Sequence, residues 1–183
     1  IVLSIAAGIR LADLARWLGA GTPIVRAMPN RPALIGAGIT ALYAGNGIAA
    51  RDREDVEALM SAAGSTVWLD QESQMDAVTA ISGSGPAYFF LLIEALESAG
   101  VASGLPAATA RRLAIETARG AGLMAAQGGE TPAVLREQVT SRGGTTEAAL
   151  QVLEAAAVSD TFRSAVAAAA RRSAQLADEF GST

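Results

Sequence analysis

The residues best suited to chemistry lie in one short turn, Glu137–Leu150 (EQVTSRGGTTEAAL), between two segments with a helical pattern. Gly143 and Gly144 leave the backbone bare there, and Thr145 and Thr146 open the second segment. The first N–H groups of a helix have no partner inside the helix, and the helix dipole adds positive charge, so this turn could hold a carboxylate or a phosphate. The alternative is a turn in which Thr145 only caps the helix, although one cap does not explain four hydroxyl residues and two glycines.

Two other glycine motifs give weaker signals. GAGITA at 36–41 matches the dinucleotide-binding pattern G-x-G-x-x-A, but that pattern requires a helix after it, and strand-forming residues follow here. We interpret it as a bend that leads into a strand. SGSGP at 82–86 is interpreted mainly as a kink after which Pro86 restarts a helix, and contact with a ligand is the alternative.

The composition excludes several kinds of chemistry. The 183 residues include no cysteine and no histidine, so thiolate chemistry, thiolate metal sites and proton transfer by histidine are excluded within this chain, and no metal site is expected. The net charge of −4 and the lack of a basic run argue against nucleic-acid binding. No apolar run approaches the roughly 20 residues of a membrane span, so we expect a cytoplasmic protein that binds no membrane.

The pattern of residues 1–70 predicts the last part of an α/β domain. Two apolar runs, Ile1–Ile5 and Pro23–Met28, flank a helical pattern at 9–18, which is typical of a βαβ unit with two parallel strands. Further along, we expect strands at 39–44 and 65–69 and a helix at 53–63.

From residue 71 onwards the pattern is helical. The helix expected at 87–99 is apolar nearly all round, and the last helix, at 161–180, carries a seam of small residues; both features favour burial in a dimer. The other helices are expected at 76–81, at 106–127, from 131 to the turn, and at 146–157. We therefore predict two domains, residues 1–70 and residues 71–183.

Four blocks of the sequence resemble the pyrroline-5-carboxylate reductase family, and they occur in the family's order. They are SIAAGI (4–9), MPNRPALIGAGITALYA (28–44), MDAVTAISGSGPAYFFLLIEAL (75–96) and QVTSRGGTTEAALQVLE (138–154). The resemblance implies an α/β then all-α fold, in which the tail end of a Rossmann-type parallel sheet is followed by a helical dimerisation domain. It also implies the last step of proline biosynthesis, in which 1-pyrroline-5-carboxylate is reduced to L-proline by hydride transfer from NADPH or NADH.

The resemblance assigns roles to residues of the turn. The substrate carboxylate would lie on the N–H groups of Gly144, Thr145 and Thr146, and the Thr146 hydroxyl would help to supply or relay a proton to the ring nitrogen. Water, or an already protonated iminium, stays open as the proton source. The implied substrate-binding residues are Val139, Ser141, Gly143, Gly144, Thr145 and Thr146, with Thr146 as the catalytic residue, and the implied cofactor-binding residues are Ala6, Ala7, Gly8 and Gln138.

The sequence departs from the family in three respects. Arg142 stands where the family often has proline, and Arg31 where it often has threonine, which affects loop rigidity more than function. Nothing matches the family's glycine-rich phosphate-binding loop, so we expect the C-terminal two thirds of such an enzyme, inactive by itself. A homodimer through residues 71–183 is expected, with a ring such as a decamer as a larger assembly.

Two other functions stay open. One is a different reductase that joins a Rossmann domain to a helical domain, such as a hydroxyacid dehydrogenase or a ketopantoate reductase. Those enzymes use a lysine of the helical domain as an acid, whereas all 14 basic residues of this chain are arginine. The other is a non-catalytic helical dimer module, in which the turn is only a capped helix start.

Overall fold

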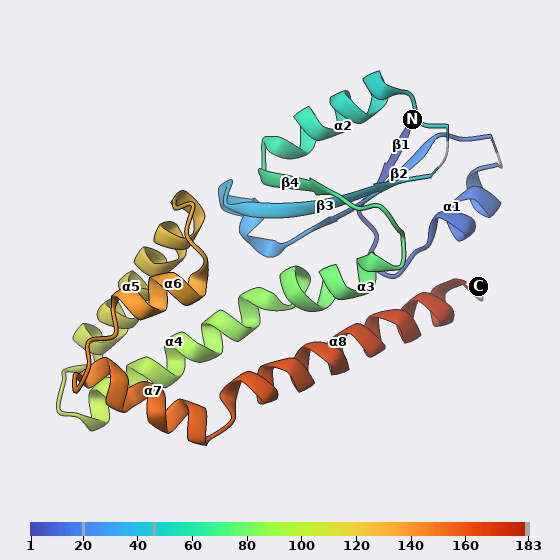
Figure 1. Cartoon of the computed structure of the whole chain (residues 1–183). Coiled ribbons are helices and arrows are strands. Elements are labelled where there is room, and N and C mark those ends of the chain that lie inside the picture. The colour runs from blue at the N-terminus through green and yellow to red at the C-terminus, as the bar shows by residue number, and fades with distance from the viewer. Residues whose placement is uncertain (20, 46, 182–183) are drawn as a thin grey trace. The chain divides into compact units, whose positions relative to one another are not determined.

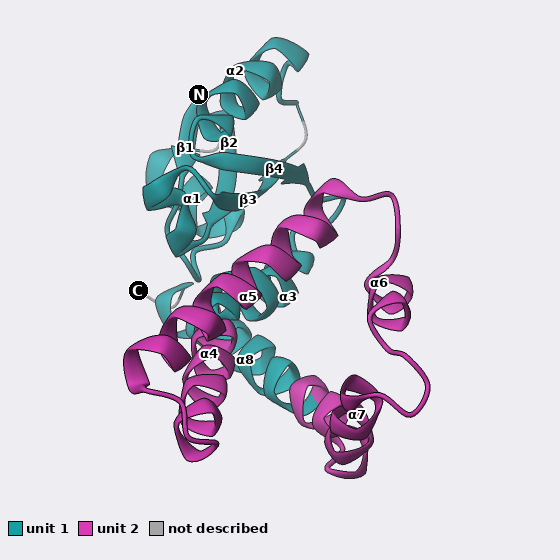
Figure 2. Cartoon of the chain, turned by 90° about the vertical axis from the view of Figure 1, so that its left-hand side faces the viewer, with its two compact units in different colours: residues 1–86, 164–183 teal, residues 87–163 magenta. Residues whose placement is uncertain are grey.

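Figure 1 shows the fold as a computed structural model, which describes residues 1–19, 21–45 and 47–181. The chain forms two compact units (Figure 2). Unit 1 combines residues 1–86 with residues from 164 onwards, and unit 2 comprises residues 87–163. The division into domains 1–70 and 71–183 stays a prediction.

Unit 1 contains a four-stranded sheet whose strands lie in sequence order. Its two outer strand pairs are parallel, as the sequence predicts, but the middle pair is antiparallel, so the sheet is mixed rather than wholly parallel. The middle connection is only a short 3-10 helix, Arg31–Ile35, and a parallel pair needs a longer crossover, so the chain must reverse direction there. The strands are β1 (Val2–Ser4), β2 (Ile24–Pro29), β3 (Gly38–Ala44) and β4 (Gly64–Trp68).

The GAGITA motif forms the bend into β3, which confirms the interpretation from the sequence. The 3-10 helix ends at Gly36, which has a left-handed φ of 71°, and β3 begins two residues later. A side chain at Gly64 would collide with the backbone of Gly38 on the neighbouring strand. Gly36 therefore serves the left-handed bend after the 3-10 helix, and Gly38 lies where β3 and β4 approach closely.

The core of unit 1 lies between the sheet and the helix α2 (Ala50–Ser61), which covers one face of the sheet (Figure 1). Val25 and Leu42, from the two central strands, are fully buried, and Val56 of α2 packs with them. Alternate residues of a strand point to opposite faces, so these side chains define the covered face. α1 (Leu11–Leu18) connects β1 to β2, as expected for the βαβ unit.

One carboxylate joins three parts of unit 1. The Oε1 atom of Glu72, in the segment after β4, accepts a hydrogen bond from the Leu11 N–H at the start of α1, with a length of 2.7 Å. The same oxygen lies 2.7 Å from the guanidinium of Arg26 on β2, whose side chain is only 11% exposed. Burying this guanidinium is favourable only because a charged partner accepts its hydrogen bond.

From residue 164 onwards, α8 (Val158–Gly181) belongs to unit 1. The Ser173 hydroxyl donates a 2.7 Å hydrogen bond to Asp76, which lies on the short helix α3 (Gln74–Val78). Arg10 forms a 2.8 Å ion pair with Asp178, so the end of α8 is also held near the start of α1.

Unit 2 is built from helices that largely match the helical pattern. α4 continues to Ala102, past the end expected at residue 99, and the bare backbone of Gly100 lets Ala110 of α5 approach closely. A Cβ at Gly100 would lie 3.0 Å from the Cβ of Ala110. The helices are α4 (Gly85–Ala102, from residue 87 in this unit), α5 (Ala107–Gln127), α6 (Pro132–Gln138) and α7 (Thr145–Ala155), together with the first turns of α8.

The SGSGP motif lies where the regular helix is interrupted, as the sequence predicts: Ser84 is a bend, and α4 begins at Gly85 with Pro86 in its first turn. Thr79–Gly83 forms a π-helical segment between α3 and α4, and the Oγ atom of Ser82 is buried without a hydrogen-bond partner in the described part of the chain. The 29-residue stretch Gln74–Ala102 is the one helix, among the residues described, that is long and apolar enough to cross a membrane by length and composition alone. Asp76, Glu94 and Glu97 divide this stretch into shorter runs, none of which reaches the roughly 20 apolar residues of a membrane span.

We predict that Glu72→Ala lowers the free energy of unfolding by about 2–3 kcal/mol, because it leaves the buried Arg26 guanidinium without its partner. Urea unfolding followed by the fluorescence of Trp17 and Trp68, both in unit 1, measures this change. Glu54→Ala is the control, since the Glu54 side chain is exposed on α2. A loss equal to that of Glu54→Ala would show that the Glu72 contacts contribute nothing.

Candidate active site

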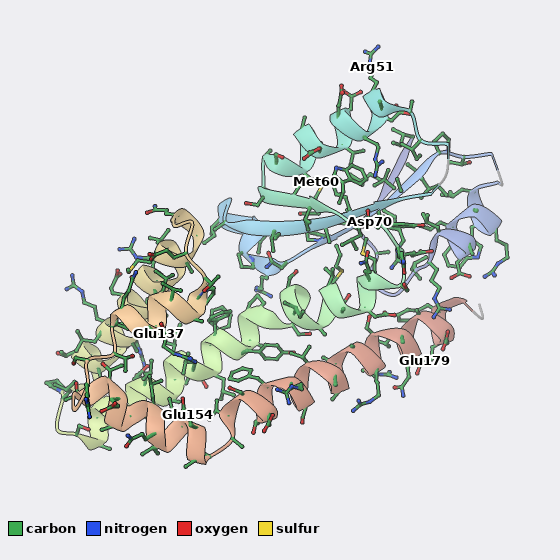
Figure 3. The ribbon with its side chains drawn as sticks, viewed as in Figure 1. Arg51, Met60, Asp70, Glu137, Glu154 and Glu179 are labelled. Atoms are coloured by element: carbon green, nitrogen blue, oxygen red, sulfur yellow. The ribbon has the colours of Figure 1, made fainter. Side chains whose placement is uncertain are left out.

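The turn predicted to hold an anion connects α6 to α7 within unit 2. Glu137, near the end of α6, and Glu154, near the end of α7, mark the two flanking helices in Figure 3. After α6, the Thr140 hydroxyl donates a 2.6 Å hydrogen bond to the Arg136 carbonyl, which closes the last helical turn. Val139, expected to wall the substrate ring, is 60% exposed, so its apolar side chain is available for contact.

The residues Ser141–Gly144 form a β-turn. The Gly144 N–H donates a 3.0 Å hydrogen bond to the Ser141 carbonyl, and Gly143 has a φ of 72°. Arg142 has a negative φ, so the two central residues have the signs of a type II turn. Such a turn favours glycine at its third position and proline at its second, and Arg142 occupies that second position.

The N-terminus of α7 is open. Gly144 is the N-cap residue and forms no side-chain cap, so the alternative in which Thr145 caps the helix is wrong: Thr145 is the first helical residue. The backbone N–H groups of Thr145, Thr146 and Glu147 have no hydrogen-bond acceptor among residues 1–19, 21–45 and 47–181. The first intrahelical bond, 3.2 Å long, runs from the Ala148 N–H to the Gly144 carbonyl. Three donors therefore point out of the helix at its positive end.

One expected donor is not available for a ligand. The Gly144 N–H was expected to bind the substrate carboxylate, but it is already donated to Ser141 within the β-turn. The Gly143 N–H is also occupied, by the Oε2 atom of Glu147 at 2.7 Å. The available backbone donors are thus shifted by one residue, to Thr145, Thr146 and Glu147.

Three hydroxyls surround these donors. The hydroxyls of Ser141, Thr145 and Thr146 make no hydrogen bond with any part of the chain that the structure describes. Ser141 and Thr145 are exposed, whereas Thr146 is half-buried. The turn therefore combines open backbone donors with neutral hydroxyls, which suits an anion that carries a polar atom beside it.

The predicted cofactor-binding residues lie in two places. Ala6, Ala7 and Gly8 form a loop of unit 1 directly after β1, at the end of a parallel strand where dinucleotides bind in open α/β sheets. Ala6 and Ala7 are exposed, while Gly8 has a φ of 77° and packs against the ring of Phe180. Gln138 lies in unit 2, where its side-chain amide donates to both carboxylate oxygens of Glu130 at 2.9 and 2.8 Å.

The structure thus brings Val139–Thr146 together in one turn and Ala6–Gly8 together in one loop. The sequence analysis missed the hydrogen bond from Gly143 to Glu147. An acidic residue at the third position of a helix is a known capping signal. Glu147 is the third helical residue after the N-cap Gly144, so the sequence contained this signal. In the described part of the chain, no group of three or more Asp, Glu, His or Cys side chains could hold a metal ion.

Comparisons with known proteins agree with this fold. Residues 72–176 match the family model described as pyrroline-5-carboxylate reductase dimerisation. The chain is 49% identical over 181 residues to a pyrroline-5-carboxylate reductase of Pseudomonas aeruginosa, covering 99% of this chain and 66% of that protein. It is 46% identical to one of Mycobacterium leprae, covering 96% of this chain and 65% of that protein.

Solved structures give the same result. A pyrroline-5-carboxylate reductase from Coxiella burnetii matches with a TM-score of 0.93 and 40% identity, covering 96% of this chain and 65% of the other. A pyrroline carboxylate reductase of Plasmodium falciparum, solved with NADP bound, matches with a TM-score of 0.88 and 32% identity, covering 97% of this chain and 71% of the other.

The fold and the turn place the chain in the class that joins the end of a Rossmann-type sheet to a helical dimerisation domain. The chain belongs to the pyrroline-5-carboxylate reductase family. It spans about two thirds, 65–66%, of the length of the curated relatives from Pseudomonas aeruginosa and Mycobacterium leprae.

We predict that Arg142→Pro stabilises the chain by about 0.4–1 kcal/mol. Proline fixes a φ near that of the second position of a type II turn and reduces the conformational entropy of the unfolded chain. The Arg142 N–H donates no hydrogen bond to the described residues, so none is lost. Urea unfolding followed by circular dichroism measures the change, with Arg142→Ala as control. Destabilisation by Arg142→Pro alone would show that the turn has another geometry.

Proposed function

We propose that this chain supplies the substrate-binding turn of an enzyme that reduces 1-pyrroline-5-carboxylate to L-proline with NADPH or NADH, the last step of proline biosynthesis. The observation that carries the proposal is the open N-terminus of α7, where three backbone donors lie beside the Thr146 hydroxyl. Membership of the reductase family supports it. The cytoplasm stays the expected location.

The proposed substrate-binding residues are Val139, Ser141, Gly143, Gly144, Thr145 and Thr146. The carboxylate lies on the N–H groups of Thr145 and Thr146, which have no competing acceptor. Hydrogen bonds from backbone donors to an anion are stronger than those between neutral groups. Gly143 and Gly144 contribute by shape, because they carry no side chain and the ligand can come close to the backbone.

Reduction of the imine requires a hydride at carbon and a proton at nitrogen. The nicotinamide cofactor supplies the hydride when bound, and the proposed residues that contact it are Ala6, Ala7, Gly8 and Gln138. Thr146 is the proposed catalytic residue, because its hydroxyl can donate to the ring nitrogen as that nitrogen gains basicity. A threonine hydroxyl is a weak acid, so it relays a proton from water or stabilises an iminium that is already protonated.

The proposed assembly is a homodimer through the helical part of the chain. Unit 2 exposes large apolar side chains on more than one side of α4: Phe89, Phe90 and Leu91 are 64%, 58% and 66% exposed. An exposed apolar patch of this kind marks a surface that a partner covers, and the matching family model is one of dimerisation. A second copy accounts for the apolar composition of Gln74–Ala102 without a membrane. Assembly of dimers into a ring such as a decamer stays a prediction.

We predict that Thr146→Val lowers turnover about ten- to a hundredfold while the Michaelis constant changes little. The valine keeps the volume and the backbone donors and removes only the hydroxyl, whose hydrogen bond strengthens in the transition state. The measurement is steady-state reduction of pyrroline-5-carboxylate by a chimaera in which the first third of the Pseudomonas aeruginosa relative precedes this chain.

Thr145→Val is the matched control, since it removes the neighbouring exposed hydroxyl from the same helical turn and keeps the Thr145 N–H that is proposed to bind the carboxylate. If Thr146→Val keeps full turnover and raises only the Michaelis constant, Thr146 is a wall of the binding site and the proton comes from water. If the unchanged chimaera reduces no pyrroline-5-carboxylate, the proposed reaction itself is wrong.

We predict that Leu91→Glu raises the dissociation constant of the dimer more than about tenfold, because it places an unpaired charge in an apolar interface. Sedimentation equilibrium of the chain at micromolar concentration measures this. The control is Val152→Glu on α7, which is equally exposed at 69% and lies on another helix. A monomer before substitution, or binding of the unchanged chain to phosphatidylcholine vesicles, would contradict the proposal.

A further inference from the structure

The helix α7 is capped in an unusual way. Its N-cap residue is glycine and offers no side chain, whereas α6 has an ordinary cap, in which the Thr131 hydroxyl accepts from the Val134 N–H. In α7 the Glu147 carboxylate reaches back past the N-cap and accepts the Gly143 N–H at 2.7 Å. The cap therefore fixes the turn that precedes the helix and leaves the first helical donors open.

We propose that Glu147 is a positioning residue for the substrate carboxylate: it holds the left-handed turn at Gly143 so that the N–H groups of Thr145 and Thr146 face the ligand. This inference rests on the proposed function of the turn. A serine, threonine or aspartate at the N-cap would stabilise the helix equally well, but its oxygen would occupy the N–H of the second or third helical residue. With Gly144 at the N-cap and the Glu147 carboxylate as acceptor, the start of the helix is stabilised while the N–H groups proposed for the ligand stay open.

The charge of Glu147 has an opposite effect on the same ligand. Glu147 forms no ion pair in the described structure, and its carboxylate lies within one helical turn of the open donors. A second carboxylate at those donors is repelled by it. Neutral glutamine keeps an acceptor oxygen for the Gly143 N–H and removes the charge, whereas alanine removes both. The two substitutions therefore separate positioning from charge.

The experiment is a titration of the chain with L-proline, followed by the amide resonances of Thr145 and Thr146, in the unchanged chain and in three variants. For Glu147→Ala we expect the dissociation constant to rise about three- to tenfold, as for the loss of one hydrogen bond. For Glu147→Gln we expect an equal or about twofold lower dissociation constant. Glu154→Gln is the matched control on the same helix, since the Glu154 side chain is exposed and forms no hydrogen bond or ion pair with the residues that the structure describes. Its dissociation constant should not change.

Turnover of the chimaera provides the second readout. Glu147→Ala should raise the Michaelis constant for pyrroline-5-carboxylate by the same factor and leave the turnover number within about twofold, because the lost contact acts on binding alone. If both Glu147 variants bind proline more tightly, the carboxylate acts only as a charge and the positioning role is wrong. If neither differs from Glu154→Gln, Glu147 has no role in the site.

Failure of the proposed function gives a different result. If proline does not shift the Thr145 and Thr146 amides of the unchanged chain, the turn does not bind this carboxylate. The positioning role is then decided by hydrogen exchange of the Gly143 amide. This amide should be protected from exchange in the unchanged chain and in Glu147→Gln, and it should exchange rapidly in Glu147→Ala. Equal exchange in all three would overturn it.

Discussion

A single carboxylate oxygen, Oε1 of Glu72, fixes the geometry of unit 1 near the proposed cofactor loop. It accepts the first N–H of α1 and the guanidinium of Arg26, so a helix start and a central strand share one acceptor. The loop at Ala6–Gly8 lies directly upstream of α1 and directly downstream of β1. Its two ends are therefore held by the sheet and by Glu72, and the Phe180 ring packs against Gly8.

Much of the fold could be predicted from the sequence because it is local. The βαβ unit follows from two apolar runs and one helical stripe, and the helices of unit 2 follow from their apolar spacing and their terminal glycines and prolines. The antiparallel pairing of β2 with β3 depends on the short connection between these strands. The sequence pattern at 29–38 did not indicate the 3-10 helix that forms this connection.

The contacts that hold α8 against the rest of unit 1 could not be predicted. Ser173 and Asp76 are 97 residues apart in the sequence, and neither lies in a motif that indicates a partner. Long-range hydrogen bonds of this kind depend on tertiary packing, which local periodicity does not contain. In the candidate site the open helix start was predicted from Gly143 and Gly144, and the N–H groups of Thr145 and Thr146 are open as expected. The Gly144 N–H is not, because it donates to the Ser141 carbonyl within the β-turn.

Arg142 gives the turn a property that proline would not. It stands at the corner of the β-turn, is exposed, and forms no ion pair with the described part of the chain. A positive charge there attracts an anion over a distance of about 10 Å at 0.1 M salt, and added salt screens this attraction. Ionic strength would therefore change how often a negatively charged molecule reaches the turn, while the backbone donors proposed to bind it stay the same. Compared with proline at the same position, arginine makes the turn less rigid and speeds its encounter with anions.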